Sequence, residues 1–370
     1  MKRLQKAWFV PTFGVRPACL VGRDIALASL MQGLITSPGN PSRTTVISGL
    51  QGMGKTALLL EFGERAAEQG FIVARATPHS NMLPEIIQTL QMKGSLLTTG
   101  KRHKSRGLAA SALGFSAGLT FNQSLDNQYG FKVKLSLLCD ELAKYEQGVL
   151  ILIDDMQASS EELRELIVAY QYLVGEEKDV AIAFALQPKA LVSLADDEMS
   201  TFLLRAQRIS LDALAAEDAR AYFYRAFKAL DKKASPETLK ALAAAVQGYP
   251  YLLQLLGYRL LAYLGDDAVI DDEMVALALD DAQRSLVDTV FKPCLKPLSK
   301  QDVAFLEALA AIRPSKKVAD AATRLKKATN YAQQYRLRLM EAGLIRTTKR
   351  GEVEFSLPYL AEYLGAEQVE

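Results

Sequence analysis

The sequence predicts an α/β fold: a parallel sheet with helices on both faces, followed by a small all-helical region and a further small domain. Short apolar runs rich in β-branched residues alternate with helical patterns as far as about Ser200. Beyond that point the strand patterns mostly stop, while helical patterns continue and are interrupted at Gly248. The predicted strands lie around Val46–Ile47, Phe71–Ala76, Val149–Asp155 and Val180–Leu186.

A glycine-rich motif follows the first predicted strand and opens a helix. Residues 49–56 read GLQGMGKT and fit the P-loop pattern G-x-x-x-x-G-K-[ST]. Glycines can turn backbone N–H groups toward phosphate oxygens, and the following helix adds its positive end. The alternative is a chance glycine-rich turn, but the flanking strand and helix favour an NTP-binding P-loop. Its predicted binding residues are Gly49, Gln51, Gly52, Met53, Gly54, Lys55, Thr56 and Ala57.

The apolar run Val149–Ile153 ends in two aspartates and supplies the second half of this site. Thr56 and Asp154 are the predicted Mg²⁺ ligands, because hydroxyl and carboxylate oxygens suit that ion. Lys55 is expected to reach the β- and γ-phosphates, and Asp155 to act as the general base. Many ATPases carry Glu at that position, so the shorter Asp predicts slow hydrolysis. A strand-terminal turn or helix cap is the alternative for both aspartates.

Three further polar residues are predicted catalytic candidates. Gln187 ends the fourth predicted strand, where an amide can bond the γ-phosphate or the attacking water. Arg205 and Arg208 precede the helical region and can reach a phosphate in the same chain or in a neighbouring subunit. The alternatives are a turn residue before Pro188 and two solvated arginines.

Composition excludes several other classes of protein. Of 370 residues, 49% are hydrophobic and 23% charged, and the net charge of +2 gives no global argument for nucleic acid. The three cysteines, Cys19, Cys139 and Cys294, are widely spaced and the only histidines are His79 and His103, so a zinc site is not expected. No apolar run is long enough to span a membrane, and we expect a cytoplasmic location.

The carboxyl-terminal residues show the rhythm of a winged helix. Helical patterns at 299–312, 317–325 and 329–342 precede a predicted hairpin with Lys349-Arg350-Gly351 at its tip. Between Arg313 and Arg350 there are eleven basic residues and two acidic ones, a local charge of +9 that is typical of phosphate binding. The alternative is a solvated winged helix that binds protein. The predicted DNA-binding residues are Lys326, Lys327, Gln333, Gln334, Arg336, Arg338, Lys349 and Arg350.

With these residues the chain resembles the AAA+/STAND group of P-loop ATPases, most closely the origin-recognition-like and archaeal or prophage-type AAA ATPases. Residues 49–56 and 149–155 correspond to the Walker A and Walker B elements. Leu20-Val21-Gly22-Arg23-Asp24 is similar to the V-G-R-E box of those families, with Asp24 in place of Glu. Gly248-Tyr249-Pro250 resembles the G-x-P motif of the STAND lid. The resemblance implies that Val21, Gly22, Arg23 and Pro250 lie near the adenine.

The predicted domains are a P-loop ATPase core at 1–205, a helical lid at 206–295 and a winged-helix domain at 296–370. Residues 94–134 are expected to form a flexible insertion, because a basic run, KRHKSR, precedes a stretch of small apolar residues. The alternative for that stretch is a membrane-seeking segment too short to span a bilayer.

These features predict a molecular switch that binds ATP or ADP with Mg²⁺, hydrolyses ATP slowly and couples its nucleotide state to binding of double-stranded DNA. The alternative is a STAND-type signalling ATPase whose winged helix binds a protein partner and drives oligomerisation. A third hypothesis is a nucleotide-binding protein without turnover.

Overall fold

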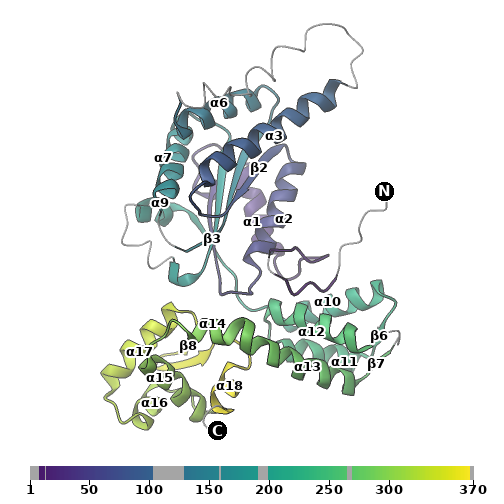
Figure 1. Cartoon of the computed structure of the whole chain (residues 1–370), viewed down its shortest axis with the longest axis vertical. Helices are drawn as coiled ribbons and strands as arrows, with labels where there is room; N and C mark the ends of the chain where they lie inside the picture. Colours follow the sequence, from purple (N-terminus) through teal and green to yellow (C-terminus); the bar gives the residue numbers. More distant parts are fainter. Residues whose placement is uncertain are drawn as a thin grey trace. The chain divides into compact units, whose positions relative to one another are not determined.

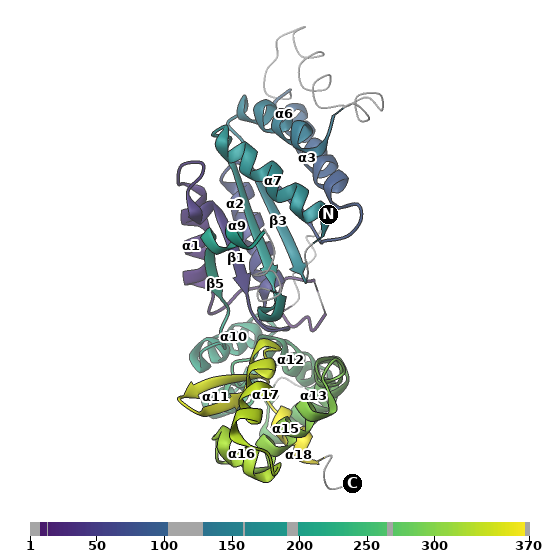
Figure 2. The same ribbon diagram turned by 90° about the vertical axis from the view of Figure 1, so that its left-hand side faces the viewer.

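The structure, a computed structural model, describes residues 8–12, 14–102, 129–157, 160–190, 199–264 and 269–366. It divides into two compact units. The core unit comprises Arg23–Gly49 and Lys55–Leu211, and the second unit comprises Met1–Gly22, Leu50–Gly54 and Asp212–Glu370. The elements of each unit are labelled in Figures 1 and 2.

A five-stranded parallel sheet forms the centre of the core unit, which confirms the predicted architecture. Its spatial order is β2-β3-β4-β1-β5. The inner strands are buried on both faces, and this is why they read as unbroken apolar runs. All carboxyl ends meet at one edge, where ligands of open α/β sheets bind. The strands are β1 (Thr44–Ser48), β2 (Phe71–Ala76), β3 (Gly148–Met156), β4 (Val180–Leu186) and β5 (Gln207–Ser210).

Helices cover both faces of this sheet (Figure 2). One face carries α1 and α2, and the other carries α3, α6 and α7, whose apolar side chains share a core with alternate strand residues. The helices are α1 (Asp24–Leu34), α2 (Lys55–Glu68), α3 (Met82–Arg102), α6 (Phe131–Ala143), α7 (Glu161–Gly175) and α9 (Met199–Arg205), with a short 3₁₀ turn η1 (Pro41–Arg43) before β1.

Both ends of the predicted insertion at 94–134 are helical. Helix α3 continues to Arg102, well into the predicted insertion, and α6 begins at Phe131. The basic run from His103 onwards and the small apolar stretch at 107–121 lie outside the described residues.

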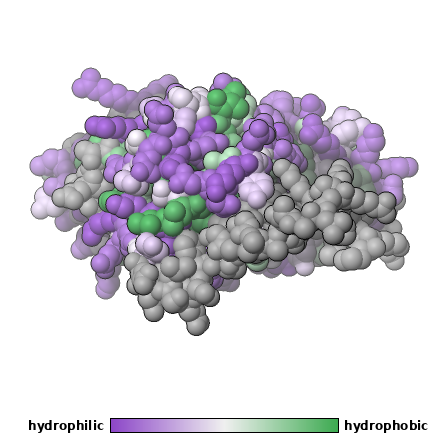
Figure 3. All heavy atoms as spheres, turned by 90° about the horizontal axis from the view of Figure 1, so that it is seen from above, coloured by the Kyte–Doolittle hydropathy of each residue, from purple (hydrophilic) through white to green (hydrophobic). Residues whose placement is uncertain are grey.

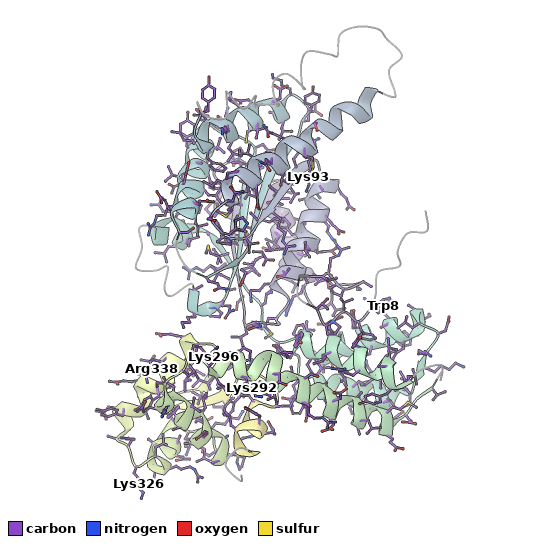
Figure 4. All side chains as sticks on the ribbon, in the orientation of Figure 1. Trp8, Lys93, Lys292, Lys296, Lys326 and Arg338 are labelled. Atoms are coloured by element: carbon purple, nitrogen blue, oxygen red, sulfur yellow. The ribbon has the colours of Figure 1, made fainter. Side chains whose placement is uncertain are left out.

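Four helices form the first part of the second unit. The segment before α1 is tied to them: Phe9 lies 5.8 to 6.0 Å, between ring centroids, from three aromatic rings of α10, and the Val10 amide donates to Gln254 Oε1 at 2.9 Å. Figure 4 shows Trp8 beside α10. The elements are α10 (Ala216–Ala229), α11 (Pro236–Val246), α12 (Pro250–Leu264) and α13 (Asp272–Leu286), with the short strands β6 (Lys233–Ala234) and β7 (Val269–Ile270).

The remaining residues include three packed helices followed by an antiparallel hairpin, an order compatible with a winged helix. This part also contacts the four-helix part, because Tyr359 Oη donates to the Ala245 carbonyl at 2.8 Å. The elements are η2 (Val287–Phe291), α14 (Lys292–Leu295), α15 (Lys300–Ala311), α16 (Val318–Arg324), α17 (Thr329–Glu341), β8 (Ile345–Lys349), β9 (Glu352–Phe355) and α18 (Leu360–Ala366).

On the face seen in Figure 3, the coloured residues are mostly hydrophilic, and the hydrophobic ones form small, separate groups. Among the residues that the structure describes, none of the helices is both apolar enough and long enough to cross a membrane.

Candidate nucleotide site

The loop between β1 and α2 has the backbone that a phosphate-binding loop needs. Gly52 and Gly54 have φ angles of 79° and 88°, in the left-handed region where a side chain is disfavoured. Helix α2 begins at Lys55, immediately after the loop. The first N–H groups of a helix have no partner inside it and carry the positive end of the helix dipole, so they favour a phosphate.

The structure brings together the two predicted metal ligands. Thr56 Oγ1 donates to Asp154 Oδ1 at 3.1 Å, and Asp154 is only 5% exposed. Thr56 lies in the first turn of α2, and Asp154 lies near the carboxyl end of β3, on which α2 packs. A hydroxyl and a carboxylate at this separation fit Mg²⁺, which takes oxygen ligands and keeps several of its waters.

Lys55 is nearly inaccessible, at 9% exposed, and its Nζ donates to the Gly49 carbonyl at 2.8 Å. Burial lowers the pKa of Lys55 to about 8, although the charges of Asp155 and Asp154 act to raise it. The two aspartates therefore act electrostatically on this ammonium group, as expected for one site. A bound phosphate would supply a negative charge that stabilises the protonated form of Lys55, which burial disfavours.

Asp155 is exposed and has a φ of 55°, unusual for a residue other than glycine. The strand register between β3 and β4 shifts between Ile153 and Met156. The Oδ2 atom of Asp155 accepts a hydrogen bond from Gln157 Nε2 at 2.9 Å. Strained backbone is common at functional sites, so this geometry is compatible with the predicted base, which stays a prediction.

The other catalytic candidates are not all gathered at the P-loop edge of the sheet. Gln187 directly follows β4 and is half-buried, so it lies at the same edge as Asp154. Arg205 ends α9 and precedes β5, at the opposite edge of this parallel sheet. Arg208 is exposed and pairs with Val46 inside the strands. Of these three residues, Gln187 is therefore the best candidate for contacting a nucleotide bound to the same chain.

Sequence reasoning missed Arg75, which contacts the predicted metal ligand Asp154. Arg75 lies on β2, and its Nη2 donates to Asp154 Oδ2 at 2.6 Å. Arg75 is the only charged residue in the strand sequence FIVARA, and an isolated charge in a buried strand was the available signal.

The G-Y-P segment contacts the backbone of the P-loop. Tyr249 Oη donates to the Gln51 carbonyl at 2.9 Å, and the Tyr251 amide donates to the Gly52 carbonyl at 3.1 Å. A Cβ on Gly52 would lie 2.3 Å from Tyr249 Oη, so glycine is required there for packing as well as conformation. Pro250 is the first residue of α12, as the G-x-P resemblance implies.

The V-G-R segment also has local constraints. Gly22 has a φ of 62°, and a Cβ there would lie 2.8 Å from Asp218 Oδ2 on α10. Arg23 is 9% exposed and immediately precedes α1, while Val21 is half-buried.

A cavity of about 300 Å³ adjoins these contacts in the second unit. Its lining joins Met53 of the P-loop and Gly248-Tyr249 to residues of the hairpin, among them Arg346 and Glu354. Leu50 of the P-loop packs close to Gly343, between α17 and β8, because a Cβ on Gly343 would lie 2.1 Å from Leu50 Cδ2.

The predicted DNA-binding residues differ in their surroundings. Arg336 donates to Gln333 Oε1 at 3.2 Å and to Thr347 Oγ1 at 2.8 Å. Arg338 makes two hydrogen bonds to Asp302 Oδ1, at 3.0 and 2.6 Å. Figure 4 shows Lys326 well apart from Arg338. The exposed candidates are Lys326, Lys327, Gln334, Arg338, Lys349 and Arg350.

Fold and site together define a P-loop ATPase core, and comparison with known proteins agrees. Residues 19–177 match the AAA ATPase domain family. Residues 288–364 match a domain of unknown function, DUF8462. No curated protein sequence matches the chain significantly.

Several solved structures share the fold along nearly the whole chain. The Walker-type ATPase paby2304 of Pyrococcus abyssi has a TM-score of 0.63 at 16% identity, with 98% of each chain covered. The Aeropyrum pernix ORC2 protein, solved as ADPNP–ADP complexes, has a TM-score of 0.62 at 14% identity, covering 97% of this chain and 98% of that one. Cdc6p from Pyrobaculum aerophilum gives 0.50 at 16% identity, covering 98% and 100%. The predicted likeness to origin-recognition-like AAA ATPases is confirmed at the level of fold.

Proposed function

We propose that this protein is a molecular switch that binds ATP with Mg²⁺, hydrolyses it slowly and couples nucleotide state to binding of double-stranded DNA. The observation that carries the proposal is the hydrogen bonding around the P-loop motif. Thr56 of that motif is hydrogen-bonded to Asp154, and the carbonyls of Gln51 and Gly52 accept from Tyr249 and Tyr251, on either side of the first residue of α12. One short segment thus joins the metal-binding oxygens to the lid.

The residues present suit the chemistry of phosphate binding. The backbone N–H groups of the loop and of the first turn of α2 would bind the β- and γ-phosphates, and Lys55 would neutralise their charge. Thr56 and Asp154 would hold Mg²⁺, which supplies further positive charge at the phosphates. Asp155 would orient and deprotonate the attacking water, and Gln187 would hydrogen-bond it or the γ-phosphate. In this proposal Val21, Gly22, Arg23 and Pro250 lie near the adenine.

Two contacts of the P-loop support a switch. The lid residue Tyr249 is bonded to Gln51, and Leu50 packs against Gly343, which follows α17 in the carboxyl-terminal domain. If the P-loop backbone changes its conformation when it binds a phosphate, both of these contacts must change as well. Because ligands shift equilibria only through differential contacts, these are the places where nucleotide state would reach the lid and the carboxyl-terminal domain.

DNA is supported by charge and exposure. The stretch from Arg313 to Arg350 carries a net charge of +9 in a chain of net charge +2. Exposed lysines and arginines at the α16–α17 turn and at the hairpin tip would contact phosphates, and Gln334 on α17 would contact base edges.

The test is binding of a fluorescent DNA duplex at about 50 and 200 mM salt, with and without ATP·Mg²⁺. We expect affinity to fall about tenfold or more between these salt concentrations if several phosphates are contacted. ATP should change the affinity in the wild type and have no effect in Lys55→Ala, which removes the cation at the phosphates. Circular dichroism would verify that Lys55→Ala remains folded.

Absence of duplex binding at low salt, with ATP binding intact, would contradict the DNA part of the proposal. It would favour the alternative, a signalling ATPase whose basic carboxyl-terminal domain binds a protein and drives oligomerisation. Absence of ATP binding would refute the nucleotide part.

A further inference from the structure

The buried carboxylate of Asp154 has a different donor on each oxygen. Thr56 Oγ1 donates to Oδ1 at 3.1 Å, and Arg75 Nη2 donates to Oδ2 at 2.6 Å. The side chain of Asp154 is 7% exposed and that of Arg75 is 37% exposed. The carboxylate is therefore held from one side by the P-loop helix and from the other by the neighbouring strand β2.

Burial explains why such a partner is needed. A carboxylate removed from water is costly unless another group compensates its charge. Arg75 provides that charge from β2, which runs beside β3 with Arg75 opposite Leu152, two residues before Asp154. The guanidinium is partly in contact with solvent, so it can leave the carboxylate at modest cost.

The same carboxylate is the predicted ligand of Mg²⁺. A divalent ion and a guanidinium on one carboxylate would repel each other, because both are cations within a few ångströms. Either the arginine or the metal can therefore neutralise Asp154 fully, and binding of one weakens binding of the other.

We propose that Arg75 is a positioning residue that competes with Mg²⁺ for Asp154. Arg75 compensates the carboxylate before the metal binds and withdraws toward solvent when the metal arrives. It thereby sets the concentration of Mg²⁺ at which the site is filled, and it reduces repulsion between Asp154 and the phosphates of a nucleotide that binds without metal. This inference rests on the proposed nucleotide site.

The experiment measures binding of a fluorescent ATP analogue, mant-ATP, in EDTA and across a Mg²⁺ titration, without following hydrolysis. The variants are Arg75→Ala, Arg75→Lys and the double variant Arg75→Ala/Asp154→Asn. The matched control is Arg65→Ala, because Arg65 also forms an ion pair, with Glu61 at 2.9 Å, but on the surface of α2. Binding of Mn²⁺, followed by electron paramagnetic resonance, gives an independent measure of the metal.

Arg75→Ala should weaken metal-free binding of mant-ATP about three- to tenfold and lower the Mg²⁺ concentration for half-maximal binding by a similar factor, the range expected for a half-exposed ion pair. Arg75→Lys should restore part of both effects because it restores the charge. The double variant should bind metal-free nucleotide as well as the wild type does, since it lacks the carboxylate that needs compensation. Arg65→Ala should match the wild type.

Unchanged metal dependence in both Arg75 variants, with nucleotide bound, would overturn this inference and leave the proposed function intact. If the wild type binds no nucleotide under any condition, the proposed function and the inference both fail. Should Arg75→Ala unfold in a thermal melt, Arg75→Lys and the double variant decide the question.

Discussion

At the scale of single residues, the burial of Lys55 makes a testable link between pH and nucleotide. Burial lowers the pKa of Lys55 from 10.5 to about 8. Phosphates that return this pKa toward its ordinary value would make the complex bind more protons than the free protein above pH 8. We therefore expect ATP affinity to fall as pH rises above 8, and binding at pH 8.5 to be accompanied by net proton uptake. Calorimetry in buffers of different ionisation enthalpy measures this uptake.

The control for this prediction is Lys55→Met, which keeps an unbranched side chain and cannot titrate. Its residual nucleotide binding should take up no proton at pH 8.5. Equal proton uptake by Lys55→Met and the wild type would assign the effect to another group and contradict the role given to Lys55.

At the scale of elements, the start of α15 and the side of α17 are joined by one buried carboxylate. Ser299 and Asp302 form a capping box, and Asp302 also accepts two hydrogen bonds from Arg338. Burial acts to raise the pKa of Asp302, but the bonds from Ser299 and Arg338 outweigh it and hold that pKa below its usual range. Asp302→Asn should lower the free energy of unfolding by about 1–3 kcal/mol, because it weakens both contacts. Urea denaturation at pH 7 measures this loss.

The sign of the pH dependence follows from the lowered pKa. The stabilisation by Asp302 is present above the pKa of an unfolded aspartate and is lost as pH falls through the lower folded pKa.

The control for Asp302→Asn is Lys349→Ala, at the exposed hairpin. It should change the free energy of unfolding by no more than about 0.5 kcal/mol and reduce only DNA binding. If Lys349→Ala lowered the free energy of unfolding as much as Asp302→Asn does, the structural role given to Asp302 and the DNA-binding role given to Lys349 would be contradicted.

At the scale of the whole molecule, the hydrogen bond from Tyr249 to the P-loop should help couple ATP to DNA. Tyr249→Phe removes that bond to Gln51 without changing the volume of the ring. The loss of about 0.5–1.5 kcal/mol should reduce the effect of ATP on duplex affinity up to about tenfold. ATP affinity itself should change less than the coupling does. Duplex titrations with and without ATP·Mg²⁺ measure the difference.

A matched tyrosine is available as a control. Tyr222 is also buried in the helical part, and its hydroxyl donates to the Trp8 carbonyl and not to the P-loop. Tyr222→Phe should leave the coupling between ATP and DNA unchanged. If the two variants affect the coupling equally, general loosening of the helices, and not the P-loop contact, is responsible.

Sequence reasoning found the site residues that belong to local sequence patterns. Lys55 and Thr56 follow from the P-loop pattern, and Asp154 follows from the apolar strand before it. Arg75 and Tyr249 were not assigned roles, because their partners Asp154 and Gln51 are 79 and 198 residues away in the chain. No local pattern carries information about such a distance.

The sequence by itself determined the alternation of strands and helices and the phosphate-binding loop, since these depend on hydrophobic period and on the backbone freedom of glycine. It did not determine that α3 would extend to Arg102 or that Arg338 would hold Asp302. Only the tertiary structure decided which charges meet, because a buried carboxylate takes whichever cation the packing of neighbouring elements brings within hydrogen-bonding distance. For Asp154 that cation is Arg75, placed there by the pairing of β2 with β3.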